Sequence, residues 1–160
     1  MKILLPIVFY LLYWGACWLG TGTDRKNLLR LRSYPDAVQA QVRAHMDAPK
    51  EKSMPAVLLS NLLLFTVVFS ALGLIFRRAL GLDSYLDAFW YFLAFGEGLG
   101  LFDLLVIDLL WWRNTKRIRF SFLPEKQPYQ DPAKHLGSFW RGIPLFAAIA
   151  ALTAAIISIF

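Results

Sequence analysis

The chain has 160 residues, of which 58% are hydrophobic, 16% are aromatic and only 18% are charged. Ordinary globular proteins are about 45 to 50% apolar and about 25% charged, so this composition excludes a disordered chain and a water-soluble enzyme of usual make-up. The 17 Lys and Arg against 11 Asp and Glu leave a net charge of +6. The single cysteine, Cys17, excludes an intrachain disulfide.

Four long apolar runs alternate with short charged stretches. A bilayer core of about 30 Å requires roughly 20 apolar residues in a helix. We therefore expect an all-α polytopic membrane protein, a single membrane domain over residues 1–160, with spans at about 3–20, 55–76, 85–112 and 139–160. The first run is also compatible with a signal peptide, but Trp14 stands near the expected cleavage site, where a small aliphatic residue is favoured, so an uncleaved helix is the better interpretation.

Basic residues predict the orientation of these spans. Seven Lys and Arg lie between residues 21 and 54 and seven more between 113 and 142, against three on the other side. Because Lys and Arg are preferentially retained in cytoplasmic loops, we expect loops 21–54 and 113–138 in the bacterial cytoplasm and both termini outside the inner membrane.

The same basic excess predicts contact with the lipid bilayer through anionic headgroups on the cytoplasmic side, and nucleic-acid binding is not expected. The residues that we expect to contact headgroups are Lys116, Arg117, Arg119 and His135.

The first cytoplasmic loop contains a predicted short amphipathic helix. Ser33 and Asp36, with Pro35 between them, resemble a helix start of the capping-box type. Apolar residues then recur at helical spacing at Val38, Val42 and Met46, opposite the polar Gln39, Gln41 and Arg43. Two interpretations stay open: the helix lies on the inner leaflet, or it caps the bundle.

The second cytoplasmic loop is predicted to be extended, because Pro124, Pro128 and Pro132 exclude a long helix. Asp131 before Pro132 is typical of a helix start, with a capping residue followed by proline in the first turn. We expect the last helix to begin there as an interfacial stretch before it enters the membrane.

Between Trp90 and Trp112 the third predicted span carries three acids, Glu97, Asp103 and Asp108. Inserting an ionised carboxylate near the bilayer centre costs about 2.5 to 3.5 kcal/mol, so the three acids need an explanation. They are protonated and hydrogen-bonded, or they face a hydrated cavity or bound cation, or they meet a basic residue of another subunit. At 100° per residue Glu97 and Asp108 share a helix face, and Asp103 points about 120° away. Asn61 on the second span is a candidate hydrogen-bond partner of Asp108.

Small residues predict how the third and fourth spans pack. A GxxxG pair lets another helix approach closely. The residues proposed for this contact are Gly96 and Gly100 on one span and Ala147, Ala151 and Ala155 on the other.

Motifs for catalysis are missing from the sequence. His45 and His135 lie in different loops without neighbouring ligands at metal-binding spacing. Ser60, Ser138 and Thr153 lack an adjacent base. We expect no metal site and no cofactor.

The stretch from Phe102 to Trp140 resembles small bacterial four-helix integral membrane proteins that are often labelled permease-like. The resemblance rests on Phe102-Asp103, Asp108, Trp111, Thr115-Lys116, Arg119, Tyr129 and His135. It implies the same topology and supplies no assigned catalytic residues.

Three function classes follow. The first is a subunit or accessory component of a membrane complex or homo-oligomer, whose buried acids meet basic residues across an interface. The second is a cation- or proton-coupled transporter or channel component that uses the intramembrane acids. The third is a divalent-cation-dependent enzyme on lipid headgroups, in which Asp103 and Asp108 hold the cation. The first is the leading interpretation, because the chain is small and lacks catalytic motifs.

Overall fold

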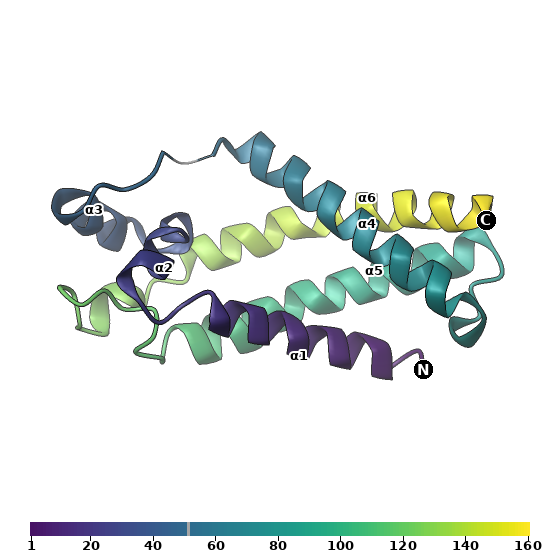
Figure 1. Cartoon of the computed structure of the whole chain (residues 1–160), viewed down its shortest axis with the longest axis horizontal. Helices are drawn as coiled ribbons and strands as arrows, with labels where there is room; N and C mark the ends of the chain where they lie inside the picture. Colours follow the sequence, from purple (N-terminus) through teal and green to yellow (C-terminus); the bar gives the residue numbers. More distant parts are fainter. Residues whose placement is uncertain (51) are drawn as a thin grey trace. The chain divides into compact units, whose positions relative to one another are not determined.

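The computed structural model describes residues 1–50 and 52–160, and this part of the chain is all-α, with six α-helices (Figure 1). A π-helix, η2, directly follows α5, and two short 3-10 turns, η1 and η3, lie in the loops. The elements in chain order are α1 (Leu4–Leu19), α2 (Asp24–Leu28), η1 (Leu31–Ser33), α3 (Asp36–His45), α4 (Met54–Leu80), α5 (Tyr85–Phe102), η2 (Asp103–Trp112), η3 (Gln127–Tyr129) and α6 (Ala133–Ile159).

The described chain forms two compact units. The first unit contains residues 1–9, 52–101 and 140–160, and the second contains residues 10–50 and 102–139. Helices α1 and α6 contribute residues to both units. The prediction of a single membrane domain does not anticipate this grouping.

Within the described residues, two helical segments are long and apolar enough to cross a membrane, Met54–Leu80 and Gln127–Ile159. The sequence predicts four such helices, so this expectation is only partly met. Helix α1 has 16 residues, which at 1.5 Å per residue is about 24 Å. The third predicted span is divided into two elements, α5, which carries Asp87 and Glu97, and the π-helix η2, which carries Asp103 and Asp108. These acids lower the mean hydropathy of the span.

Local signals in the sequence explain where the helices begin and end. Ser53 caps α4 by accepting a hydrogen bond from Ala56 N at 3.4 Å, and α4 ends at Gly81, whose φ of 61° suits glycine. Asp131 Oδ1 accepts a hydrogen bond from Ala133 N at 2.9 Å, which confirms the predicted start of α6.

The core of the first unit is built from phenylalanines. Phe69, which is fully buried on α4, stacks on Phe92 and Phe95 of α5 at centroid distances of 5.3 and 4.8 Å, and Phe9 of α1 meets Phe69 edge-on at 6.1 Å. Phe65 of α4 meets Phe146 of α6 edge-on at 5.6 Å. These aromatic contacts hold α1, α4, α5 and α6 together within this unit.

Gly96 of α5 packs against Phe146 of α6, and the predicted alanines of α6 are less buried than two other alanines of the same helix. A Cβ placed on Gly96 would lie 2.6 Å from Cδ1 of Phe146, so this glycine does allow a close approach. The buried alanines of α6 are Ala150 and Ala154, whereas Ala147 and Ala151 are half-buried and Ala155 is exposed, and Gly100 is half-buried. The prediction chose a face one residue, or about 100°, away from the buried one, because the alanine-rich sequence of α6 offers several small-residue stripes.

The second unit has its own hydrophobic core, formed by the two predicted cytoplasmic loops. Its buried members are Leu31, Tyr34, Val38, Val42, Trp112, Ile118, Phe120, Leu123 and Tyr129. Loop 113–132 is therefore not simply extended: it contains turns, an isolated bridge between Phe120 and Leu123, and η3. Tyr129 Oη stabilises the bridge by accepting from Phe120 N at 3.1 Å and donating to Leu123 O at 2.9 Å.

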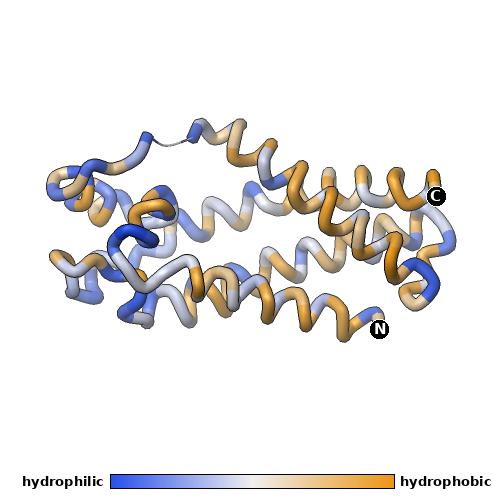
Figure 2. The backbone as a smooth tube through the Cα atoms, in the orientation of Figure 1, coloured by the Kyte–Doolittle hydropathy of each residue, from blue (hydrophilic) through white to orange (hydrophobic). Residues whose placement is uncertain are grey.

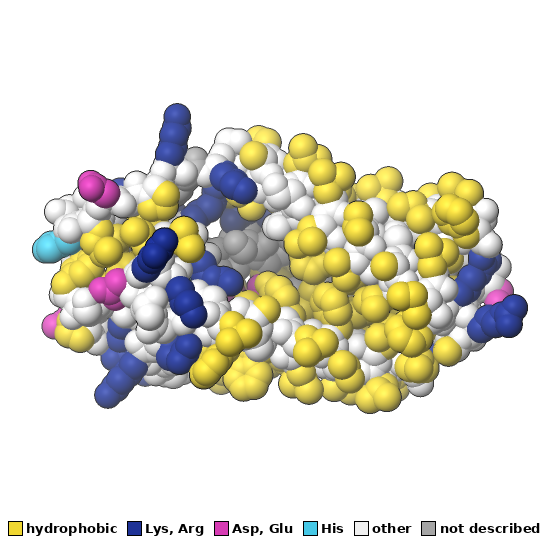
Figure 3. Space-filling model, in the orientation of Figure 1, with side chains coloured by type: hydrophobic (Ala, Val, Ile, Leu, Met, Phe, Trp, Pro, Cys, Tyr) yellow, Lys and Arg dark blue, Asp and Glu magenta, His cyan; other side chains and the backbone are white. Residues whose placement is uncertain are grey.

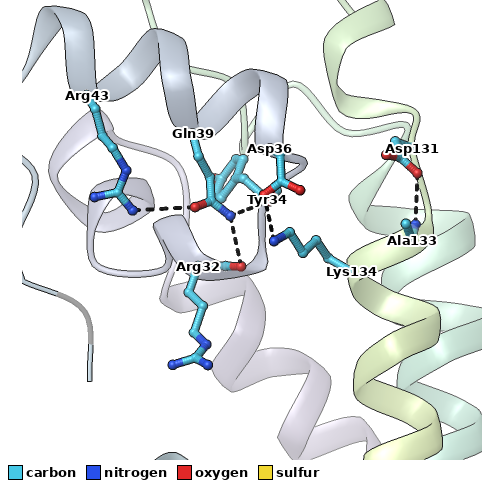
Figure 4. A network of polar contacts seen from close by, with 8 residues as sticks. All are labelled: Arg32, Tyr34, Asp36, Gln39, Arg43, Asp131, Ala133 and Lys134. Atoms are coloured by element: carbon cyan, nitrogen blue, oxygen red, sulfur yellow. Dashed lines mark hydrogen bonds and ion pairs between the residues drawn. The ribbon is translucent and has the colours of Figure 1, made fainter. Parts of the chain in front are cut away.

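The predicted amphipathic helix is α3, and its apolar stripe packs on protein. Val38 and Val42 are fully buried, and Met46 packs against the same core, so this stripe does not face lipid. Two details differ from the prediction: Ser33 lies in η1 and makes no capping bond, and Gln39 is buried. Figure 4 shows Gln39 donating to the carbonyls of Tyr34 (2.8 Å) and Arg32 (3.3 Å), with Lys134 reaching Asp36 at 2.6 Å.

Tyr34 makes the stability of the second unit depend on pH. Its hydroxyl donates to Ile118 O at 2.7 Å, and burial raises its pKa well above the ordinary value. Above about pH 10 the phenol of the unfolded chain loses its proton, whereas the phenol of the folded protein keeps it. The free energy of unfolding should therefore fall as pH rises above about 10, by up to about 1.4 kcal/mol per pH unit. Burial also raises the pKa of Tyr129, which adds to the same trend.

We expect Tyr34→Phe to weaken this alkaline dependence, at a cost of about 1 kcal/mol at neutral pH from the lost hydrogen bond. Unfolding followed between pH 8 and 11 measures both quantities. Tyr85→Phe, on an exposed tyrosine of α5, is the matched control and should leave the pH profile unchanged. An unaltered profile in Tyr34→Phe contradicts the prediction.

Large hydrophobic side chains cover the surfaces of the long helices. Figure 2 shows hydrophobic residues along α1, α4 and the later part of α6, and in Figure 3 such side chains cover the first unit while Lys and Arg gather over the second. Exposed examples on α4 alone are Leu59, Leu63, Leu64, Val67, Leu74 and Ile75. Soluble monomers rarely expose apolar patches of this extent, which fits association with a membrane.

Candidate functional site

The π-helix η2 brings two of the predicted acids to one face. A π-helix bonds residue i to residue i+5, as the hydrogen bond from Arg113 N to Asp108 O at 3.3 Å illustrates. Residues five apart, such as Asp103 and Asp108, therefore stack on one side of η2, whereas α-helical geometry separates them by about 140°. The two carboxylates are close enough to repel each other, which is consistent with this alignment.

The prediction that Glu97 and Asp108 share a face is consequently unsupported, because it assumes 100° per residue through residue 108. Glu97 lies half-buried on α5 and Asn61 half-buried on α4, both in the first unit. Asp108 has a different partner from the predicted Asn61.

That partner is His135, from the first turn of α6. His135 Nδ1 lies 2.8 Å from Asp108 Oδ2, and the two side chains are 5% and 15% exposed. The imidazole also meets Trp112 at a centroid distance of 4.8 Å, which fixes the plane of the ring. His135 Nε2 is buried and has no hydrogen-bond partner among the described residues. The structure thus buries a histidine that the sequence places among the headgroup contacts.

Arg30 supplies a positive charge beside the two acids. Its guanidinium lies close enough to Asp103 and to Cys17 to act on both side chains electrostatically. It packs on Gly20, where an added Cβ would lie 2.9 Å from Arg30 Cζ, so a larger residue there would require the Arg30 side chain to shift. Tyr13 of α1 completes the group through interactions with Asp103, Asp108 and Arg30. We call these six residues the acid cluster: Tyr13, Cys17, Arg30, Asp103, Asp108 and His135.

The charges of the acid cluster do not cancel when His135 is neutral. Two carboxylates against one guanidinium leave one uncompensated negative charge, which a single proton neutralises. When Nδ1 carries its hydrogen it donates to Asp108 Oδ2, and Nε2 then has no hydrogen-bond partner among the described residues. The acid cluster therefore gathers two carboxylates, one guanidinium and one imidazole, of which His135 is buried, Asp103 and Asp108 are half-buried and Arg30 is exposed.

No family model, curated protein or solved structure matches this chain. The resemblance to permease-like membrane proteins stays a prediction.

Loop folding explains how Arg30 reaches the acids. Asn27 on α2 is fully buried and donates through Nδ2 to Arg117 O at 3.0 Å, which ties loop 20–30 to the segment that follows η2. Thr23 caps α2 by accepting from Lys26 N. In the sequence, basic residues of this loop indicate only the orientation of the spans. No sequence feature therefore marks Arg30, among its basic neighbours, as a residue that lies near the acids.

The other predicted headgroup residues differ in exposure. Lys116 is exposed, whereas Arg117 and Arg119 are half-buried. Arg119 donates to Pro124 O at 3.1 Å, and Arg117 donates to carbonyls at the end of α1. Among the residues that the structure describes, no three His, Cys, Asp or Glu side chains are grouped to hold a metal ion.

Proposed function

We propose that this chain is an integral membrane protein of the bacterial cytoplasmic membrane, with four spans and both termini outside. The two long apolar helices and the exposed hydrophobic side chains of α1 and α4 support membrane insertion. Residues 3–20 and 85–112 complete the four spans in this proposal, because the first is apolar throughout and, in the second, Asp108 has its partner His135 within the chain. The basic loops set the orientation.

Within that membrane protein, the acid cluster is the proton-binding site of a transport system. The observation that carries this proposal is the 2.8 Å contact between His135 Nδ1 and Asp108 Oδ2, beside Asp103 and Arg30. Intramembrane acids are costly to maintain and typically serve proton or ion pathways. Histidine is a common proton carrier in such pathways, and Nε2 of His135 has no hydrogen-bond partner among the described residues.

The chain acts as one component of a larger assembly, either a homo-oligomer or a complex with other membrane subunits. Four helices are too few to enclose a transport pathway by themselves. The leading interpretation from the sequence has the acids meeting basic residues of another subunit, but His135 of the same chain already pairs with Asp108. The assembly therefore supplies the pathway, and this chain supplies the proton site.

Proton flux into proteoliposomes tests the proposal. Under an imposed pH gradient, Asp108→Asn and His135→Gln should abolish the flux that the wild-type chain supports when it is reconstituted as the oligomer or complex in which it is purified from the membrane. Glu97→Gln is the matched control, because Glu97 is another acid of the same predicted span and lies outside the acid cluster. Wild-type flux in Asp108→Asn, or a loss in Glu97→Gln as large as in Asp108→Asn, contradicts the proposed proton site.

A further inference from the structure

We propose that the C-terminal end of α1 binds an anionic phospholipid, with an acyl chain in an apolar groove and the phosphate on Arg117. The groove has a volume of about 330 Å³ and is lined by Trp14, Gly15, Trp18 and Leu19. This inference rests on the membrane insertion proposed above, but not on the acid cluster.

The groove suits a hydrocarbon chain. Its lining presents no polar surface, and Trp14, Trp18 and Leu19 remain 37%, 44% and 63% exposed. Trp111 meets Trp14 edge-on at a centroid distance of 6.4 Å and supports that side chain. Gly15 has no atom within 4 Å of the place where a Cβ would lie, so the middle of the groove is open.

Arg117 is held where the groove meets the cytoplasmic loops. Its Cζ lies 3.9 Å from the centroid of the Trp18 ring, and its Nη2 donates to Trp18 O at 3.2 Å and to Thr21 O at 3.0 Å. Both of these hydrogen bonds use Nη2, which leaves Nη1 to donate to an acceptor outside the protein. Tryptophan and arginine together are typical of the headgroup level of a bilayer.

Positive charge is in excess at this end of α1. Lys26 Nζ donates to Leu19 O at 2.9 Å, so two full cations, Arg117 and Lys26, face a helix terminus that carries only about half a negative charge. The excess favours an anion, and the adjoining apolar groove favours one that carries a hydrocarbon chain. A phosphodiester headgroup satisfies both requirements.

Lipid binding to the full chain in detergent micelles, measured by native mass spectrometry, tests the site. We expect phosphatidylglycerol to bind more tightly than phosphatidylcholine by about fivefold, the effect of one basic residue near the surface. Arg117→Gln should remove that preference. Gly15→Leu, which fills the open groove, should weaken binding of both lipids. Arg78→Gln, which removes the same charge from the exposed end of α4, is the control and should change neither.

Several results overturn the inference. One is an equal affinity for the two lipids in the wild-type chain, and another is an unchanged preference in Arg117→Gln. Displacement of the bound lipid by inorganic phosphate at millimolar concentration, without an effect of Gly15→Leu, indicates a free-anion site instead. Asp108→Asn should keep lipid binding, so failure of the proton site and failure of the lipid site are distinguishable.

Discussion

Replacing His135 with alanine is expected to lower the free energy of unfolding by about 3 kcal/mol at pH 7, because it leaves the largely buried carboxylate of Asp108 without its partner. The imidazole is 5% exposed and lies 2.8 Å from that carboxylate. Its contact with Trp112 is lost as well, which adds a packing cost. Thermal or denaturant unfolding in detergent micelles measures the change.

Lys134→Ala is the matched control for this prediction. Lys134 precedes His135 in α6 and also forms an ion pair, with Asp36 at 2.6 Å, but the two side chains of that pair are 39% and 84% exposed. Exposed pairs contribute about 0.2 to 1 kcal/mol, so Lys134→Ala should have a small effect. Adding Asp108→Asn to His135→Ala should restore part of the lost stability, since no unpaired charge then remains. Equal destabilisation by the two single variants contradicts the buried pair.

Phe69→Ala is expected to destabilise the protein by about 3 kcal/mol or more, because it removes the ring at the centre of the first unit. Phe69 is fully buried and makes ring contacts with four other phenylalanines. These four neighbours are Phe9, Phe65, Phe92 and Phe95. In a membrane the loss is one of van der Waals packing rather than of exposure to water, since lipid is as apolar as the ring.

Val67→Ala controls for a change in apolar volume on the same helix. Val67 is 67% exposed on α4, so its truncation should change the free energy of unfolding by less than about 0.5 kcal/mol. Unfolding in micelles again gives the measurement. A loss in Phe69→Ala no larger than in Val67→Ala contradicts the aromatic core.

Much of the fold follows from local signals that the sequence carries. Asp131 and Pro132 predict the start of α6, and the spacing of Val38 and Val42 predicts α3, since capping and periodicity act over a few residues. The apolar content predicts helices with exposed hydrophobic surfaces. The core of the second unit was not predicted, because Tyr34 and Ile118 are 84 residues apart and no local pattern relates them.

The acid cluster shows the same division. The sequence by itself determined that Asp103 and Asp108 lie in an apolar helical segment, where a carboxylate needs a partner. Only the tertiary structure decided which residues meet there. The π-helix turns Asp103 onto the face of Asp108, and folding of distant segments brings in His135 and Arg30. Helical periodicity and charge can be read from residues close together in sequence. The direction in which η2 points each side chain, and the partners of its acids, depend instead on contacts between residues far apart in sequence.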